Sequence, residues 1–196
     1  RESKSEYAEL IEFYCNIILC VKDSENQKYF FNVKDFFFLN NAKFDINEKR
    51  NIVNILTNYC LAKARSNDMN FRKILFELNE FSINKGFAAY NNGRINKTLY
   101  TQIISNGLIL NKTEWVINFI KKYTPKLVKE HQKSMRALAD GFVDFKLKKF
   151  EKVMLNLNKV EFIDYRDKIH VKNLTARTYF ELGEFNLLLS HIDSSK

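Results

Sequence analysis

The chain has 196 residues, of which 45% are hydrophobic and 28% are charged, and its formal net charge is +9. This balance is typical of a folded protein and argues against intrinsic disorder. One proline and five glycines are too few for the many tight turns of an all-β protein, so the composition favours helices. Because no run of about eighteen apolar residues is present, we expect no transmembrane helix.

Apolar residues recur at three- and four-residue steps along the whole chain, which is the pattern of amphipathic helices. The pattern predicts helices over residues 5–21, 29–39, 45–66, 71–83, 99–110, 115–123, 129–147, 150–158, 166–182 and 184–193. Ser5 is the expected N-cap of the first helix. Gly86 is expected in the left-handed conformation after a helix, Pro125 ends another helix, and residues 88–96, with Asn91-Asn92-Gly93, form a loop.

The first helix carries apolar residues that we interpret as one apolar helical stripe, namely Tyr7, Leu10, Ile11, Tyr14, Ile17, Ile18 and Val21. The aromatic run over 29–39 is expected to be a short buried helix, because folded chains rarely leave so many phenylalanines in water. Cys15, Cys20 and Cys60 form no C-x-x-C pair. We interpret them as buried, small apolar residues of a protein in the reducing cytoplasm.

Residues 136–192 contain two copies of one helix–turn–helix unit. A shift of about 35 residues pairs Gly141 with Ala176, Phe145 with Phe180, Leu147 with Leu182, Phe150 with Phe185, Val153 with Leu188 and Leu157 with Ile192. The same shift backward places Trp115 at the position of Phe150 and Leu110 at that of Phe145. A period near 34 is typical of tetratricopeptide-type repeats, whose short helix pairs stack into one continuous core.

The segment 176–185 resembles the turn region of a tetratricopeptide repeat. The matching residues are Ala176, Tyr179, Gly183 and Phe185. The preceding copy departs from the motif, with Lys148 at the turn glycine and Asp144 at the aromatic position. Several stretches also resemble a group of uncharacterised bacterial helical-repeat proteins: Asn58 to Lys63, Phe76 to Leu78, Glu114 to Ile120, Lys159 to Phe162 and Tyr179 to Phe185.

We therefore predict an all-α protein, a right-handed α-solenoid of about ten antiparallel helices. It forms a single domain over 1–196, with the clearest repeats over 129–196 and degenerate repeats over 1–128. The resemblance implies a scaffold that binds a peptide or protein partner on its concave face and needs no cofactor. The first helix of each pair normally lines that face, which by position makes the partner-binding residues Phe142, Lys146, Arg177 and Glu181.

No residue pattern predicts catalysis or metal binding. Asp164 and Asp167 are three residues apart, and their expected role is to stabilise a helix N-terminus. The histidines His131, His170 and His191 are far apart and have no partner at metal-ligand spacing, so we expect solvated or capping roles. Neither G-x-S-x-G nor a glycine-rich phosphate loop occurs, and we predict that the protein is not an enzyme.

The excess positive charge lies mainly in residues 121–152. This basic segment contains Lys121, Lys122, Lys126, Lys129, Lys133, Arg136, Lys146, Lys148, Lys149 and Lys152. Lysines at three- and four-residue steps can neutralise phosphates, so nucleic-acid binding is the alternative function. Against it, solvent-facing lysines commonly keep helical proteins soluble, and the segment has few arginines or interleaved aromatics.

Overall fold

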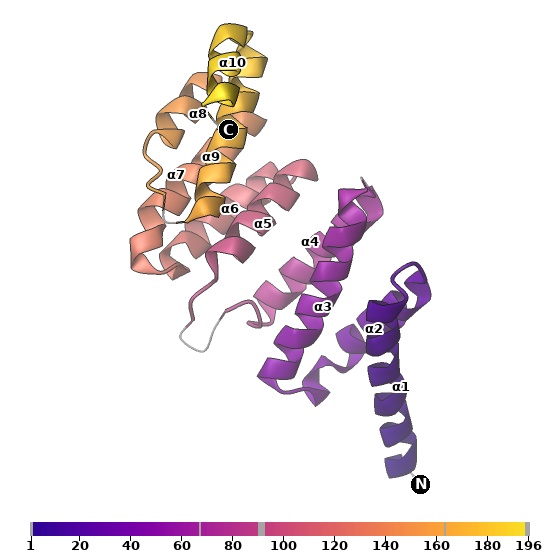
Figure 1. Ribbon diagram of the computed structural model, residues 1–196. Coiled ribbons are helices and arrows are strands. Elements are labelled where there is room, and N and C mark those ends of the chain that lie inside the picture. Colours follow the sequence, from indigo (N-terminus) through magenta and orange to yellow (C-terminus); the bar gives the residue numbers. More distant parts are fainter. Residues whose placement is uncertain (1, 67, 90–92, 163, 195–196) are drawn as a thin grey trace. The chain divides into compact units, whose positions relative to one another are not determined.

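The structure is a computed structural model that describes residues 2–66, 68–89, 93–162 and 164–194, with side chains from Tyr7 onward. This part of the chain contains ten α-helices and two short 3-10 helices (Figure 1). Most helices pack antiparallel against the next helix in the chain. The predicted all-α class and the number of helices are confirmed, whereas the right-handed solenoid stays a prediction.

The chain divides into two compact units, Arg1–Ala88 (unit 1) and Ala89–Lys196 (unit 2). Unit 1 contains α1 (Glu2–Lys22), α2 (Gln27–Asn40), η1 (Asn41–Lys43), α3 (Ile46–Arg65) and α4 (Met69–Asn84). Unit 2 contains α5 (Lys97–Ile109), α6 (Thr113–Tyr123), η2 (Thr124–Lys126), α7 (Lys129–Lys146), α8 (Phe150–Leu157), α9 (Tyr165–Leu182) and α10 (Phe185–Asp193). The single domain over 1–196 stays a prediction.

Short polar side chains start several of these helices. The N-caps whose side chains accept backbone N–H bonds are Asn26, Asp45, Asp68, Asn96 and Asp164. The prediction that Ser5 is an N-cap is wrong, because α1 begins at Glu2. Glutamate and lysine are good helix formers, so a helix can begin before its first apolar residue. Gly86 has the expected positive φ of 79°, and Pro125 follows the end of α6 within η2.

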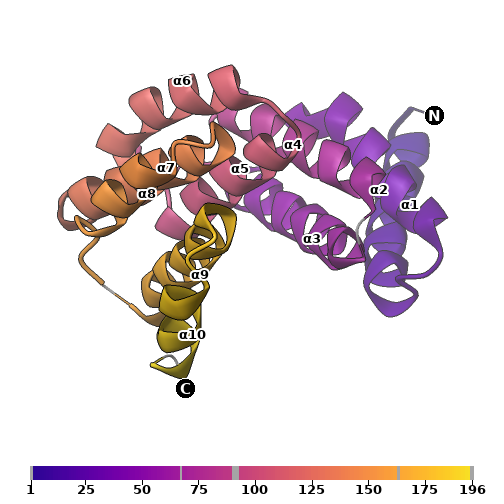
Figure 2. The same cartoon turned by 90° about the horizontal axis from the view of Figure 1, so that it is seen from above.

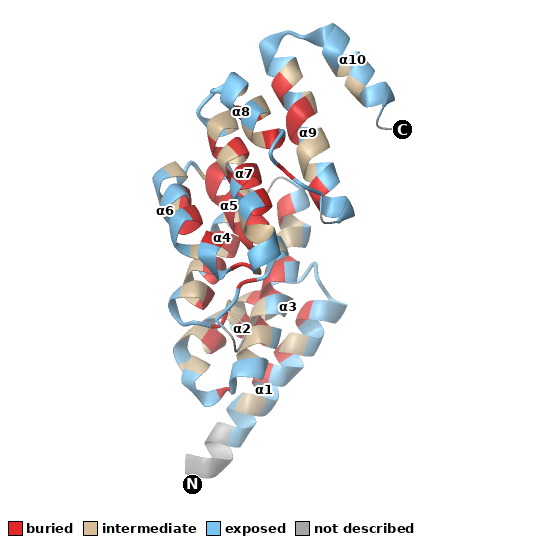
Figure 3. Ribbon diagram, turned by 90° about the vertical axis from the view of Figure 1, so that its left-hand side faces the viewer, coloured by how far each residue is buried: buried red, intermediate tan, exposed pale blue. Residues whose placement is uncertain are grey.

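An aromatic core holds unit 1 together. The ring centres of Phe30 and Tyr59 are 4.6 Å apart in a stacked pair, and Phe71 meets Phe30 edge-on at 5.4 Å. Phe37 is also fully buried. Figure 3 shows the buried residues of α2–α4 in red. The aromatic run over 29–39 is therefore core, as predicted, except for Leu39, which is 84% exposed.

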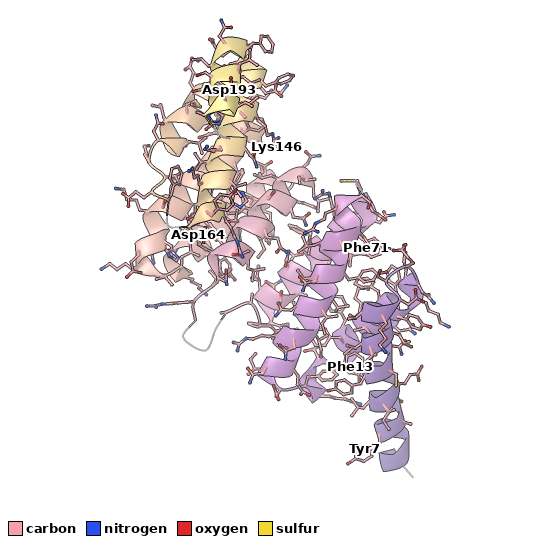
Figure 4. All side chains as sticks on the ribbon, in the orientation of Figure 1. Tyr7, Phe13, Phe71, Lys146, Asp164 and Asp193 are labelled. Atoms are coloured by element: carbon pink, nitrogen blue, oxygen red, sulfur yellow. The ribbon has the colours of Figure 1, made fainter. Side chains whose placement is uncertain are left out.

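The residues predicted to form one apolar stripe on α1 are only partly covered by the rest of unit 1. Phe13 and Cys20 are buried in the core, with Leu10 and Ile17 packed against it. The other face is exposed and carries Tyr7, Ile11, Tyr14, Ile18 and Val21. At 100° per residue the predicted residues span an arc of about 120°, and only the edge of this arc with Leu10 and Ile17 packs on the core, which is centred on Phe13 and Cys20. Figure 4 labels Phe13 among the side chains of unit 1 and Tyr7 near the N-terminal end of α1.

Three left-handed residues mark equivalent turns in unit 2. Asn111, Lys148 and Gly183 have φ values of 59°, 57° and 73°. After each of them a backbone N–H bonds to a carbonyl five residues earlier: Lys112 to Gly107 at 2.8 Å, Lys149 to Asp144 at 2.8 Å and Glu184 to Tyr179 at 2.9 Å. This is the Schellman arrangement that ends a helix. Lys148 thus adopts the left-handed conformation that glycine usually occupies at this position.

These turns fix the register of the helix pairs α5–α6, α7–α8 and α9–α10. Lys148 and Gly183 are 35 residues apart, which confirms the predicted pairing of the last two copies. Asn111 and Lys148 are 37 residues apart, so the backward shift that placed Trp115 opposite Phe150 and Leu110 opposite Phe145 is wrong by two residues. Thr113 and Leu108 are the structural equivalents. The two extra residues lie between the Asn111 turn and the Lys148 turn, where a constant shift cannot detect them.

The first helices of consecutive pairs lie next to each other. α5 packs on α6 and α7, α7 packs on α8 and α9, and α9 packs on α10. The last pair lies side by side in Figures 1 and 2. Equivalent positions in two successive pairs make different kinds of contact. Asn156 donates a hydrogen bond to Asp144 at 2.9 Å. At the same two positions one repeat later, the rings of Tyr179 and His191 lie edge-to-face at 6.0 Å.

Candidate partner-binding groove

A groove with a volume of about 310 Å³ opens between the first helices of unit 2. Its lining residues come from α5, α7, α9, the turn before α8 and the first residue of α8: Ser105, Leu108, Ile109, Phe142, Phe145, Lys146, Lys148, Phe150, Leu174, Arg177 and Glu181. Six of these side chains are aliphatic or aromatic, and the charged ones are exposed. Pockets that bind ligands commonly combine an apolar lining with a few polar groups in this way.

Equivalent positions of three repeats meet in this groove. Ser105, Phe142 and Arg177 occupy the same place on α5, α7 and α9 when the turns are aligned. Ile109, Lys146 and Glu181 occupy a second equivalent place, one turn further along each helix. The same side of each first helix therefore faces this groove, and the residue type at that position differs from repeat to repeat.

The structure brings together all four residues predicted to bind a partner. Phe142 and Lys146, which is labelled in Figure 4, come from α7, and Arg177 and Glu181 come from α9. The prediction missed Phe145 and Phe150, which also line the groove. Helical spacing from Phe142 gives the signal for Phe145, whereas Phe150 reaches the groove only because the left-handed turn at Lys148 redirects the chain.

Aromatic rings and cations are in direct contact in the groove. The guanidinium carbon of Arg177 lies 4.4 Å from the centre of the Phe145 ring, which is cation–π geometry. The Phe145 ring meets the Phe150 ring edge-on at 5.6 Å. With Lys146 and Lys148 beside Arg177, and Glu181 as the one acidic lining residue, the groove carries a net positive charge.

The lining combines an apolar surface with charged groups at its edge. Its residues include Ser105 and Glu181 but neither histidine nor cysteine. Apolar walls bind an apolar side chain, and the lysines and Arg177 can pair with carboxylates at the edge. The groove thus suits a segment that combines a large apolar residue with acidic neighbours.

A second cluster of charged residues has a structural role. The Nζ atom of Lys97 lies 2.8 Å from Asp167 Oδ2 and 2.9 Å from Asp164 Oδ2. Asp164 and Asp167 also form a capping box at the start of α9, which confirms that they stabilise a helix N-terminus as predicted. Hydrogen bonding by Lys97 holds the pKa of Asp164 below its ordinary value. The cluster joins the starts of α5 and α9, and sequence spacing could not show the distant Lys97.

The histidines and cysteines occupy separate places. His131 is half-buried at the start of α7, the His170 ring is 6.0 Å from Phe142, and His191 Nε2 lies 3.0 Å from the Lys172 carbonyl oxygen. Burial lowers the pKa of His170. Within the described residues no group of three His, Cys, Asp or Glu side chains has metal-binding geometry.

All three cysteines are free thiols. Cys20 and Cys60 are buried, as predicted, but the prediction for Cys15 is wrong because it is exposed on α1. Cys15 lies beside Tyr14 on the side of the helix that the core does not cover. A count of apolar neighbours along the sequence does not reveal which side of α1 packs.

The basic segment is divided between different surroundings. Lys146 and Lys148 line the groove, whereas the Lys122 and Lys126 ammonium groups lie 5.4 and 5.0 Å from the centre of the Tyr123 ring. The latter two lysines therefore have cation–π contacts within the protein. Nucleic-acid binding stays a prediction, and retention on generic DNA during a salt titration is its test.

In the described part of the chain, no helix combines the length and the apolar character needed to span a bilayer. Comparisons of this chain with protein-family models, with curated proteins and with solved structures find no match.

Proposed function

We propose that this protein is a non-catalytic interaction module that binds a segment of a partner protein in the groove between α5, α7 and α9. The observation that carries this proposal is that equivalent positions of three consecutive first helices converge on one hollow. A repeat fold that serves only to pack helices has no need to direct Phe142, Lys146, Arg177 and Glu181 toward the same solvent-accessible space. The concave face of a solenoid, with its right-handed twist, is part of this proposal.

The partner segment has a large apolar residue that enters between Phe142, Phe145 and Phe150. Acidic side chains next to that residue pair with Lys146, Lys148 and Arg177 at the edge of the groove. The apolar contact supplies most of the affinity, because buried aromatic anchors dominate interfaces. The charged contacts fix the direction and register of the segment, since Glu181 repels an acidic side chain that the neighbouring cations attract.

Selection from a random-peptide display library on the 196-residue chain tests this proposal. We expect enriched peptides that share an aromatic or large aliphatic residue next to aspartate or glutamate. Fluorescence polarisation then measures Kd for one selected peptide. Lys146→Glu is expected to weaken binding at least about tenfold, which is about 1.4 kcal/mol.

Lys121→Glu is the matched control, because Lys121 is an exposed lysine on α6 outside the groove. The same reversal of charge there is expected to change Kd less than about twofold, since exposed charges at a distance are screened by salt. Equal losses in the two variants, or a selection that enriches no shared pattern, would contradict the proposed site.

A further inference from the structure

The turn between α7 and α8 carries a lysine where the two equivalent turns carry residues suited to the left-handed conformation. Asn111 has a φ of 59° and Gly183 a φ of 73°, and both residue types adopt positive φ values at low cost. Lys148 has a φ of 57°, although a lysine side chain makes this conformation costly. Of these three described residues, Lys148 alone lines the groove between α5, α7 and α9.

The contacts of Lys148 within the protein do not explain why a lysine stands at this turn. Its backbone N–H donates to the Phe145 carbonyl oxygen at 3.0 Å, a bond that glycine makes equally well. Its side chain is exposed, and among the residues that the structure describes its ammonium group has no ion pair, hydrogen bond or cation–π partner. A strained backbone that stabilises no other part of a protein is characteristic of functional sites.

The other two cations of the groove have ordinary positions. Lys146 is the last residue of α7, where lysine is a good helix former and interacts favourably with the helix dipole. The Arg177 guanidinium carbon lies 4.4 Å from the centre of the Phe145 ring, so Arg177 has a contact within the protein. Lys148 is therefore the lining cation whose presence most requires a ligand outside the chain.

Lys148 lies in the sequence between the two aromatic rings of the groove that meet edge-on. Phe145 precedes it by three residues, Phe150 follows it by two, and the ring centres are 5.6 Å apart. All three residues line the groove. An apolar side chain that contacts these rings brings its neighbours in the partner segment to the turn that carries Lys148.

We propose that Lys148 is the specificity-determining residue of this groove, and that its ammonium group pairs with a carboxylate next to the apolar anchor of the partner segment. The inference rests on the proposed function and names the residue that selects its partner. Glycine at this turn gives a more stable protein that binds such a segment more weakly, because Lys148→Gly removes the strained conformation and the ammonium group together. A lysine that only keeps the surface soluble gives no change in Kd.

A double-mutant cycle between protein and peptide tests the inference. The probe is one fluorescein-labelled peptide selected on the unchanged 196-residue chain, and its acidic residues are replaced one at a time by the corresponding amides. Fluorescence polarisation measures Kd for each pair. With the acidic peptide, Lys148→Gly is expected to weaken binding about fivefold, the size of a solvent-exposed ion pair. With the peptide that lacks the paired carboxylate, the same variant is expected to change Kd less than about twofold.

Two control variants separate the charge of Lys148 from other effects. Asn111→Gly makes the same backbone change at the equivalent turn, which is not part of the groove lining. Lys149→Gln removes the charge of the neighbouring exposed lysine, which also lies outside the lining. Both are expected to keep Kd for the acidic peptide within about twofold, and urea unfolding checks that every variant is folded.

Failure of this inference differs from failure of the proposed function. If Lys148→Gly weakens the acidic peptide and every amide peptide equally, or leaves Kd unchanged while Lys146→Glu weakens binding, the groove binds a partner but Lys148 does not select it. An equal loss in Lys149→Gln also overturns the inference, because it indicates a general attraction to the basic segment. A selection that enriches no shared pattern overturns the proposed function and this inference together.

Discussion

Arg177 on α9 and Phe145 on α7 are joined by a cation–π contact, with 4.4 Å between the guanidinium carbon and the ring centre. The contact links the first helices of two consecutive pairs at the wall of the groove. Arg177 is exposed and arginine carries five N–H donors, so donors remain available for a carboxylate.

We expect Arg177 and Phe145 to be energetically coupled. In a double-mutant cycle with Arg177→Gln and Phe145→Leu, urea unfolding is expected to give a coupling free energy of about 0.5–1 kcal/mol, the usual size for a partly exposed cation–π pair. Arg136→Gln with Phe145→Leu serves as the comparison, because Arg136 pairs with Asp140 instead. The two changes in that second cycle are expected to be additive, and a coupling of similar size in both cycles would argue against a specific contact.

Lys148→Gly is expected to stabilise the protein by about 1 kcal/mol. Lys148 has a φ of 57°, a conformation that costs a residue with a Cβ atom about 1–2 kcal/mol and costs glycine very little. Asn111→Gly is expected to stabilise the protein by less than Lys148→Gly does, since asparagine tolerates the left-handed region better than lysine. Gly183→Ala is expected to destabilise the protein by about 1 kcal/mol for the same reason.

Urea unfolding measures these three changes, and Lys152→Gly within α8 is the control. Glycine there is expected to cost about 1 kcal/mol, because Lys152 has ordinary helical geometry. A loss of stability in Lys148→Gly would show that the lysine side chain contributes more than its backbone conformation costs.

Lys97→Met is expected to destabilise the protein by about 3 kcal/mol at neutral pH, because it removes the ammonium group that lies 2.8 Å from the buried Asp167 carboxylate. Lys97 also holds the pKa of Asp164 below its ordinary value, so the ionised carboxylate stabilises the folded state above the unfolded pKa of about 3.9. That contribution is lost as the pH falls through the lower folded pKa. The variant is therefore expected to lose less further stability in acid than the unchanged protein.

Urea midpoints measured between pH 6 and pH 3 give this comparison. Lys133→Met on the exposed side of α7 is the control and is expected to stay within about 0.5 kcal/mol of the unchanged protein. If the curves of Lys97→Met and the unchanged protein run parallel into acid, Asp164 does not depend on Lys97.

One thiol is expected to react rapidly with a thiol reagent in the folded protein. Cys15 is exposed, whereas Cys20 and Cys60 are buried, and burial raises the pKa of the Cys60 thiol to about 12. Little thiolate forms at the buried sites, and the thiolate is the reactive species. The colour released by a disulfide reagent at neutral pH measures how many thiols react rapidly. Cys15→Ser is expected to abolish the rapid phase, and a rapid phase that survives this change would place a second thiol at the surface.

The sequence by itself determined the helices and most of their ends. Periodic apolar residues, short polar N-caps and left-handed glycines act within a few residues of one another, so they are visible without tertiary information. The repeat around Lys148 and Gly183 was predictable for the same reason, since both copies have the same length. The predicted alignment of α5–α6 with α7–α8 was wrong, because an insertion of two residues changes none of the local sequence signals.

Which face of a helix is covered was decided only by the tertiary structure. α1 carries apolar residues on both faces, and only the packing of α2 and the aromatic core selects Phe13 over Tyr14. The groove likewise needs α5, α7 and α9 to lie side by side, which brings Ser105, Phe142 and Arg177 together from three separate segments. Local sequence determines where a helix forms, but the burial of its surface depends on which distant segment packs against it.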